Sequence, residues 1–308
     1  MFTAITSIVL MSLSVPPAED LPPGFVPAER ELSDEALIEK LAACEDENCA
    51  TFLELRGRGP SIWTALLPLV LPAPETRRPP KELTRFWAIG LCAAHRHQPC
   101  AEPLKRIIAV GPEPRLRAAS AYAIARIMGP PAADSLLLAL TDSDINVRFE
   151  AASAIGDLRL GDDSVVTGLL ATFTDGDGDV RRAAIEALGL GGNPKAVQPL
   201  ADRLGRETVA MNRGFAAIAL GQLRGRAAAS QLIARFTVEE DAEALAAAAW
   251  ALGELGDGAA VAPLEVLSKH ANQQVRESAR AALVELKRVP ERAPRELPKV
   301  QPKKTPGR

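Results

Sequence analysis

A periodic pattern of small and apolar residues constrains the fold of this chain more than any other feature. Equivalent positions recur about every 32 residues, at Ile124, Ile155, Leu188, Leu220, Leu252 and Leu283. A fixed period of this length is typical of stacked units that contact only their neighbours, not of one globular core. We therefore expect function to lie on a repeated surface.

Each unit is predicted to be a helical hairpin. In the first helix, small and apolar residues recur at helical spacing, as at Val180, Ala184 and Leu188. Alanine is the strongest helix former and lets a neighbouring backbone approach closely, which favours tight stacking. The glycines expected to end these first helices are Gly156, Gly189, Gly221 and Gly253. The second, apolar helices are predicted at 135–140, 165–173, 197–204, 228–236 and 261–267.

The turns and first helices also carry a short motif. Asp-x-x-Val-Arg occurs at 144–148 and 177–181, Ala-x-x-Ala-Leu-Gly at 184–189, and Pro-Leu in several second helices. In these elements the chain resembles the HEAT repeat family, in particular the short bacterial lyase HEAT-like repeat, over residues 80–289. The resemblance implies an all-α fold, namely an α-solenoid with a right-handed superhelix of six or seven stacked helical hairpins.

In that family, an aspartate at the turn and an arginine in the following helix form a ladder between repeats. By the resemblance, the ladder here would use Asp144, Arg148, Asp179 and Arg181, with Arg117 and Arg276 as further candidates. The turn aspartates are also well placed as helix N-caps. The Val-Arg pair is lost at 211–213 and at 244–245, so the resemblance leaves the ladder open there.

Composition agrees with a repeat array and disfavours several functions. Hydrophobic residues make up 47% of the chain and aromatic residues 4%, which suits an alanine-rich solenoid spine. The net charge of -3 gives no reason to expect a nucleic-acid partner, because phosphate-binding proteins usually carry a basic stripe. No apolar run is long enough for a transmembrane span. We expect a monomer.

The two ends of the chain differ from the array. Residues 1–18 have an apolar core typical of a signal peptide, although no Lys or Arg precedes that core. We therefore expect export by a bacterium, to the periplasm, the envelope or the exterior. The alternative is a buried N-terminal segment in a cytoplasmic protein. The remaining predicted parts are a Pro-rich linker (19–31), a helical lead-in (32–82), the HEAT-like array (83–289) and a basic, Pro-rich, disordered tail (290–308).

The cysteines fall in two close pairs, Cys44 with Cys49 and Cys92 with Cys100. An even count beside a candidate signal peptide favours disulfides, either within each pair or between hairpins. A zinc site is the first alternative, because Cys92, His95, His97 and Cys100 offer two sulfurs and two imidazoles. Free buried thiols are the second. We expect no metal or other cofactor.

Catalysis has little support in the sequence. The histidines are His95, His97 and His270, and no set of nucleophile, base and orienting residue can be identified. The His-Glu pairs of the related deoxyhypusine hydroxylases are also missing from the sequence. We therefore predict a protein that is not an enzyme.

The predicted function is a protein-protein interaction scaffold that uses the concave face of the solenoid, lined by the second helices. The candidate wall residues are Lys105, Arg106, Gln198, Asp202, Arg203, Gln231, Arg235, Glu265 and Lys269. Their mixed charge favours a protein partner. Trp250 is interpreted as packing between repeats. The alternatives are an accessory subunit of an enzyme system, like the bilin lyases, and a nucleic-acid-binding repeat protein.

Overall fold

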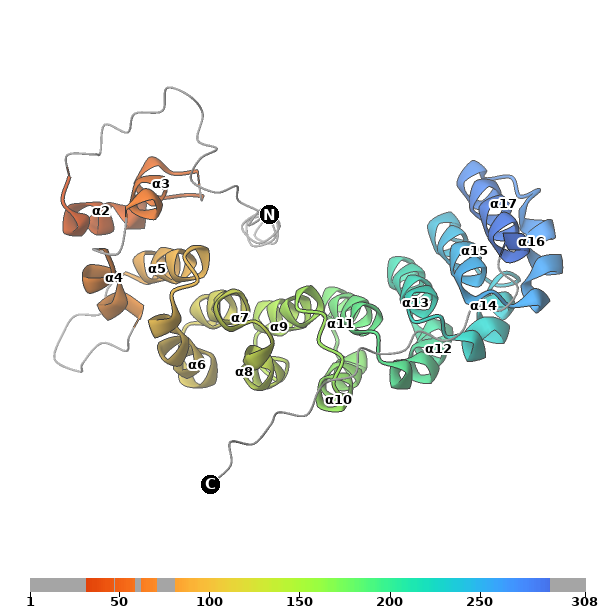
Figure 1. Cartoon of the computed structure of the whole chain (residues 1–308), viewed down its shortest axis with the longest axis horizontal. Helices are drawn as coiled ribbons and strands as arrows, with labels where there is room; N and C mark the ends of the chain where they lie inside the picture. Colours follow the sequence, from red (N-terminus) through yellow and green to blue (C-terminus); the bar gives the residue numbers. More distant parts are fainter. Residues whose placement is uncertain (1–31, 47, 59–61, 71–80, 289–308) are drawn as a thin grey trace. The chain divides into compact units, whose positions relative to one another are not determined.

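The computed structural model describes residues 32–46, 48–58, 62–70 and 81–288. The chain divides into two compact units, Met1–Glu150 and Ala151–Arg308. The predicted signal peptide, the Pro-rich linker and the basic tail lie outside the described residues, and the predicted domain boundaries stay predictions. Within the described residues, every regular element is helical (Figure 1).

The first unit is built from helices that pair in sequence order. They are α2 (Asp34–Lys40), α3 (Ala50–Gly57), α4 (Trp63–Val70), α5 (Glu82–Ala94), α6 (Ala101–Val110), α7 (Pro114–Met128) and α8 (Ala133–Ala139). In α7, Pro114 occupies the first turn, where a missing N–H costs nothing, and Gly129 ends the helix with a φ of 64°. The buried face of α7 carries Leu116 and Ile124, and α7 packs against α5 and α6.

Two disulfides close local loops in the first unit. Cys44 is bonded to Cys49, and Cys92 to Cys100. This is the connectivity within each pair that was one of the predicted options. Trp87 of α5 is 2% exposed, and its indole N–H donates to the carbonyl of Cys44 at 3.2 Å, which ties the first loop to the helical core.

The zinc alternative does not agree with these bonds. The disulfide uses both sulfurs of the proposed ligand set, so neither thiolate is left for a metal. The two histidines lie on an aromatic ring instead. His97 stacks on Trp63 with ring centroids 3.8 Å apart, and His95 meets the same ring edge-on at 5.4 Å.

The second unit contains repeated hairpins in two layers (Figure 1). Its first helices are α11 (Gly178–Gly191), α13 (Ala210–Gln222), α15 (Ala242–Leu255) and α17 (Gln273–Arg288). Its second helices are α10 (Asp163–Ala171), α12 (Val197–Arg206), α14 (Ala229–Arg235) and α16 (Val261–Leu267), and α9 (Ile145–Asp157) spans the boundary between the units. Successive first helices pack on one another, as α11 on α13, α13 on α15 and α15 on α17. The fold is thus the predicted all-α solenoid of stacked hairpins.

The role predicted for the repeated glycines is wrong. Gly189, Gly221 and Gly253 lie inside their helices, which continue to Gly191, Gln222 and Leu255. A left-handed backbone occurs beyond two of these helices instead, at Gly192 and Gly256, with φ of 73° and 68°. The glycines inside the helices instead allow the next repeat to pack closely.

Each of these glycines packs against an alanine of the next repeat. A Cβ atom at Gly189 would lie 2.9 Å from the Cα of Ala219, and one at Gly253 would lie 2.9 Å from the Cα of Ala282. Contacts this short are not tolerated in a close-packed interior. Glycine is therefore required because the next helix backbone lies where a side chain would be.

Candidate functional site

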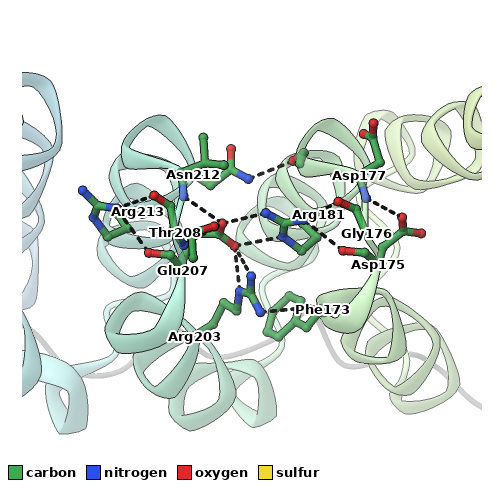
Figure 2. A network of polar contacts seen from close by, with 12 residues as sticks. Phe173, Asp175, Gly176, Asp177, Arg181, Arg203, Glu207, Thr208, Asn212 and Arg213 are labelled. Atoms are coloured by element: carbon green, nitrogen blue, oxygen red, sulfur yellow. Dashed lines mark hydrogen bonds and ion pairs between the residues drawn. The ribbon is translucent and has the colours of Figure 1, made fainter.

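A buried carboxylate joins two repeats of the second unit. Glu207 follows α12, and its side chain is 0% exposed. Arg181 of α11 donates to it twice, from Nε at 3.1 Å and Nη2 at 2.8 Å. Arg203 also donates from Nε at 2.8 Å, and the backbone N–H groups of Thr208 and Val209 donate at 3.1 Å each (Figure 2). The carboxylate therefore accepts hydrogen bonds from two guanidinium groups and two amides.

These donors keep Glu207 ionised. Burial by itself would raise the pKa of the carboxyl, but the hydrogen bonds from Arg181 and Arg203 outweigh it and lower the pKa to about 2. The same contact raises the pKa of Arg181. Arg181 also donates to the carbonyls of Asp175 and Gly176, at 2.9 and 3.2 Å, so it links the start of its own helix to the next repeat.

The arrangement recurs one period further along the chain with the same residue types. Arg213 donates to Glu239 from Nε at 2.6 Å and Nη2 at 2.7 Å, and Arg235 donates to the same carboxylate at 2.8 Å. Hydrogen bonding to Arg213, and then to Arg235, lowers the pKa of Glu239 to about 2 against the opposing effect of burial. In the first unit, Arg117 binds Asp142 at 2.7 and 2.8 Å in the corresponding way. We call these three arginine–carboxylate contacts the rungs.

The rungs correct the ladder expected from the sequence. Asp144 and Asp179 are not the acidic partners in any of them. Asp144 accepts from the backbone N–H of Asn146 at 2.9 Å, and Asp179 pairs with Arg182 within the same helix. The reason is local, because these aspartates lie in the first turn of their own helices and contact groups there.

Two other arginines of the expected ladder donate to backbone carbonyls. Arg148 donates to the carbonyls of Asp142 and Ser143 at 2.8 and 3.1 Å, and Arg276 donates to those of His270 and Ala271 at 2.8 and 2.6 Å. The rung at Arg213 persists although the Val-Arg motif is lost there. At the next equivalent position the chain has Leu245, which is buried.

The predicted wall residues differ in what they contact. Arg203 and Arg235 belong to the rungs, and their charges are used within the fold. Gln198 donates to Asp202 at 2.9 Å, Lys105 pairs with Glu102 at 2.7 Å, and Gln231 accepts from Ser230 at 2.8 Å. Arg106, Glu265 and Lys269 are exposed. Their role in binding stays a prediction.

An apolar groove lies elsewhere, across the first helices α13, α15 and α17. Its volume is about 570 Å³. The lining residues are Met211, Gly214, Phe215, Ile218, Gln222, Glu243, Ala244, Ala246, Ala247, Trp250, Gln274 and Ser278. Met211 is 57% exposed and Trp250 39% exposed, and among the lining residues only Glu243 is charged. We call this surface the first-helix groove.

The groove forms because α15 contributes mostly small residues between larger neighbours. Ala244 and Ala247 face it from α15, while Met211 and Phe215 rise beside them from α13. Trp250 combines two roles. One edge of its ring packs where a Cβ at Gly221 would lie 2.6 Å from Cζ3, as expected for packing between repeats. The rest of the ring is open to the groove, which the sequence interpretation missed.

Among the described residues, no cluster of three His, Cys, Asp or Glu side chains is placed to hold a metal ion. No described helix combines the length and hydrophobicity that a membrane crossing requires.

Comparisons with known proteins identify repeats in two parts of the chain. A family model for HEAT repeats matches residues 133–214, and a model for PBS lyase HEAT-like repeats matches residues 244–270. A comparison with curated proteins finds no match. The X-ray structure of YibA from Escherichia coli is similar with a TM-score of 0.63 and 18% identity, over 84% of this chain and 93% of that one.

Two enzyme-related structures are more distant. Human deoxyhypusine hydroxylase in complex with glycerol has a TM-score of 0.38 at 20% identity, over 83% of this chain and 97% of that one. A chain of the CpcE–CpcF complex of phycocyanin lyase from Nostoc sp. PCC7120 has a TM-score of 0.40 at 19% identity, over 70% of this chain and 98% of that one.

Proposed function

Because the chain belongs to the HEAT-repeat proteins, we propose that it is a non-catalytic module that binds a partner protein through the first-helix groove. The observation that carries this proposal is the exposure of large apolar side chains in one hollow, with Met211 57% and Trp250 39% exposed. Clustered exposed apolar residues rimmed by polar ones mark sites of protein interaction. Stacked repeats commonly present such extended surfaces.

The chemistry of the lining favours a protein over the other partner classes. A polyanion needs basic side chains, whereas the charged lining residue is the acidic Glu243. The groove crosses three neighbouring first helices, which suits an extended or helical segment of a protein. Trp and Met are both enriched at the cores of protein interfaces. An apolar segment without an acidic cluster is therefore the ligand that fits.

This site replaces the second-helix wall as the surface that we propose. Arg203 and Arg235 of that wall bind buried carboxylates inside the fold, so they contribute little free charge to a partner. The proposed binding role is unchanged in class. It moves from mixed charges on the second helices to apolar contacts on the first helices.

The test begins with a photoreactive amino acid at Met211 in cells of the source organism, with the same group at Val266 as the control. Val266 of α16 is 72% exposed and does not line the groove. The partner that is captured at Met211 alone is then purified, and its Kd is measured by calorimetry. Met211→Glu should weaken binding at least ten-fold, while Val266→Glu should change it less than two-fold. Equal affinities for both variants would refute the groove as the binding site.

We also propose that the chain works in an oxidising compartment. Two disulfides within the first unit support this, because such bonds persist mainly outside the reducing cytoplasm. The predicted signal peptide is consistent with the same location. Loss of residues 1–18 from protein isolated from its host, measured by intact mass, would support export, and an intact N-terminus on cytoplasmic protein would refute it.

A further inference from the structure

The first-helix groove has a nearby candidate occupant within the same chain. Its third wall, α17, contributes Gln274 and Ser278 and ends at Arg288. The chain then continues to Arg308. We propose that the C-terminal segment, residues 290–308, binds in the first-helix groove of its own molecule. The inference rests on the proposed function, because the segment would compete there with the partner protein.

The segment is long enough to reach the groove. From Arg288 back to the level of Ser278 is ten helical residues, or about 15 Å at about 1.5 Å per residue. Crossing from α17 over α15 to α13 adds two helix spacings, or about 20 Å. An extended segment of 19 residues spans about 59 Å at about 3.1 Å per residue. The required path is the sum of the first two lengths. It is shorter than the extended segment, so the segment can reach α13 with residues left over.

The chemistry of the segment matches the groove. It contains Pro290, Pro294, Pro298, Pro302 and Pro306. Proline-rich chains bind aromatic-lined grooves, because their extended backbone loses little conformational entropy and their rings pack on aromatic faces. Trp250 and Phe215 supply such faces in the lining. The groove is thus suited to an extended, proline-rich chain.

The charges are also complementary. The segment carries Arg292, Arg295, Lys299, Lys303, Lys304 and Arg308 against Glu291 and Glu296, which gives six positive and two negative charges, or +4. Glu243 is the charged residue of the lining and has the opposite sign. Attraction between them favours the segment over the apolar N-terminal residues 2–15, which contain no Lys or Arg.

The anchor is expected at Leu297 and Pro298. Prolines at every fourth residue do not align on one face of a polyproline helix, which has three residues per turn, so only part of the segment can contact the ring at once. Trp250 lies one helix away from α17, so the path runs about 15 Å back along α17 and about 10 Å across, which corresponds to about eight extended residues beyond the helix end. Leu297 lies nine residues beyond Arg288 and is the first large apolar residue after Val289.

Binding within one molecule would make the segment an internal competitor. A tethered ligand acts at an effective concentration in the millimolar range, so even weak contacts hold it in place. A partner must then displace the segment. The apparent affinity of the partner is its intrinsic affinity multiplied by the fraction of molecules in which the groove is free.

The first experiment uses the full chain with a photoreactive amino acid at Met211, irradiated in dilute solution and examined by mass spectrometry. The expected product has the mass of one chain and joins residue 211 to a peptide from residues 290–308, in a yield independent of protein concentration. The same group at Val266 should give no such product. A product of twice the chain mass, or a link to residues 2–15, would overturn the proposal in favour of a second copy or the N-terminal segment.

The second experiment measures the synthetic peptide 290–308 by fluorescence anisotropy. The peptide should bind a chain that ends at residue 289 at least ten-fold more tightly than the full chain. A full-chain variant, Leu297→Asp with Pro298→Ala, should also bind the peptide more tightly than the wild type, which covers the case in which truncation disturbs folding. Equal binding by all three proteins would overturn the proposal.

The same variants separate this inference from the proposed function. If the partner binds the full chain and the truncated chain equally, yet Met211→Glu weakens both, the groove is a partner site and internal docking is refuted. If the peptide binds but the partner ignores Met211→Glu, the segment occupies the groove and the proposed partner site is wrong.

Discussion

Replacing Glu207 by Gln should destabilise the second unit in a pH-dependent way. The carboxylate accepts from Arg181, Arg203 and two backbone amides, and its pKa falls from the ordinary 4.5 to about 2. A difference of about 2.5 pH units corresponds to about 3.4 kcal/mol in favour of the ionised form in the folded protein. Glutamine removes this charge and leaves buried Arg181 without it, so we expect a loss of about 3 kcal/mol at pH 7.

The direction of the pH dependence follows from the lowered pKa. A lowered carboxyl pKa stabilises the folded state fully above about pH 4.5, and this contribution is lost as the pH falls through about 2. At pH 3 the carboxylate still contributes about 1.4 kcal/mol by the same linkage relation. The difference in unfolding free energy between wild type and Glu207→Gln should therefore shrink by about 2 kcal/mol between pH 7 and pH 3.

The assay is urea unfolding followed by circular dichroism at pH 7, 5, 4 and 3, with the slope of the transition checked for constancy. Glu186→Gln is the matched control, because Glu186 pairs with Arg182 on the surface at 3.2 Å and should cost less than about 0.5 kcal/mol. A loss below about 1 kcal/mol at pH 7, or one that is the same at pH 7 and pH 3, would show that the charge of Glu207 does not stabilise the folded state.

Three further predictions concern packing, the disulfides and the second rung. Gly189→Ala should cost about 1–3 kcal/mol, since its Cβ would lie 2.9 Å from the Cα of Ala219. Gly205→Ala in α12 should not destabilise, because its Cβ would meet no atom within 4 Å beyond the backbone of its own helix, and urea midpoints compare the two variants. Replacing Cys92 and Cys100 together by Ala, which removes a disulfide between residues eight apart and leaves Cys44–Cys49 in place, should cost about 2–3 kcal/mol. The fall in Tm against the wild type measures this loss, and an unchanged Tm would contradict it. Glu239→Gln should match Glu207→Gln in size and pH dependence, because its pKa is also about 2; hydrogen exchange in α13 and α15 would report it, and unaltered protection there would count against the rung.

The sequence predicted the repeats well because their signal is local and recurs. A period of about 32 residues and the alanine stripe identify the hairpins, and the second helices begin and end close to the predicted ranges. The matched motif likewise located the arginines at Arg117 and Arg181. Helical periodicity is a property of neighbouring residues, so one chain is enough to show it.

The acidic partners could not be read from the same motif. Glu207 lies 26 residues after Arg181, in the turn of the next repeat, and its distance to Arg181 depends on how the repeats stack. A signal was nevertheless present, since Arg181, Arg203 and Glu207 recur one period later as Arg213, Arg235 and Glu239. Aligning charged residues across the period would have found the rungs.

The groove was missed for a different reason. Ala244 and Ala247 belong to the same small-residue pattern as the buried alanines, and only their position between Met211 and α17 makes a hollow there. The depth of the groove depends on the relative sizes of neighbouring side chains from three repeats. The sequence of any one helix does not contain that information.

The constant interval of the rungs makes the repeats interchangeable parts. Removing residues 207–238 would bring Glu239 into the place of Glu207, four residues after Arg203 and 26 after Arg181. The same cut would present Ala251 to Gly189 in place of Ala219. Both the ion pair and the helix contact across the new joint would be restored by residues already in the chain. An array of this kind can change length by whole repeats, through unequal recombination or by design, and still keep the same interface between adjacent repeats.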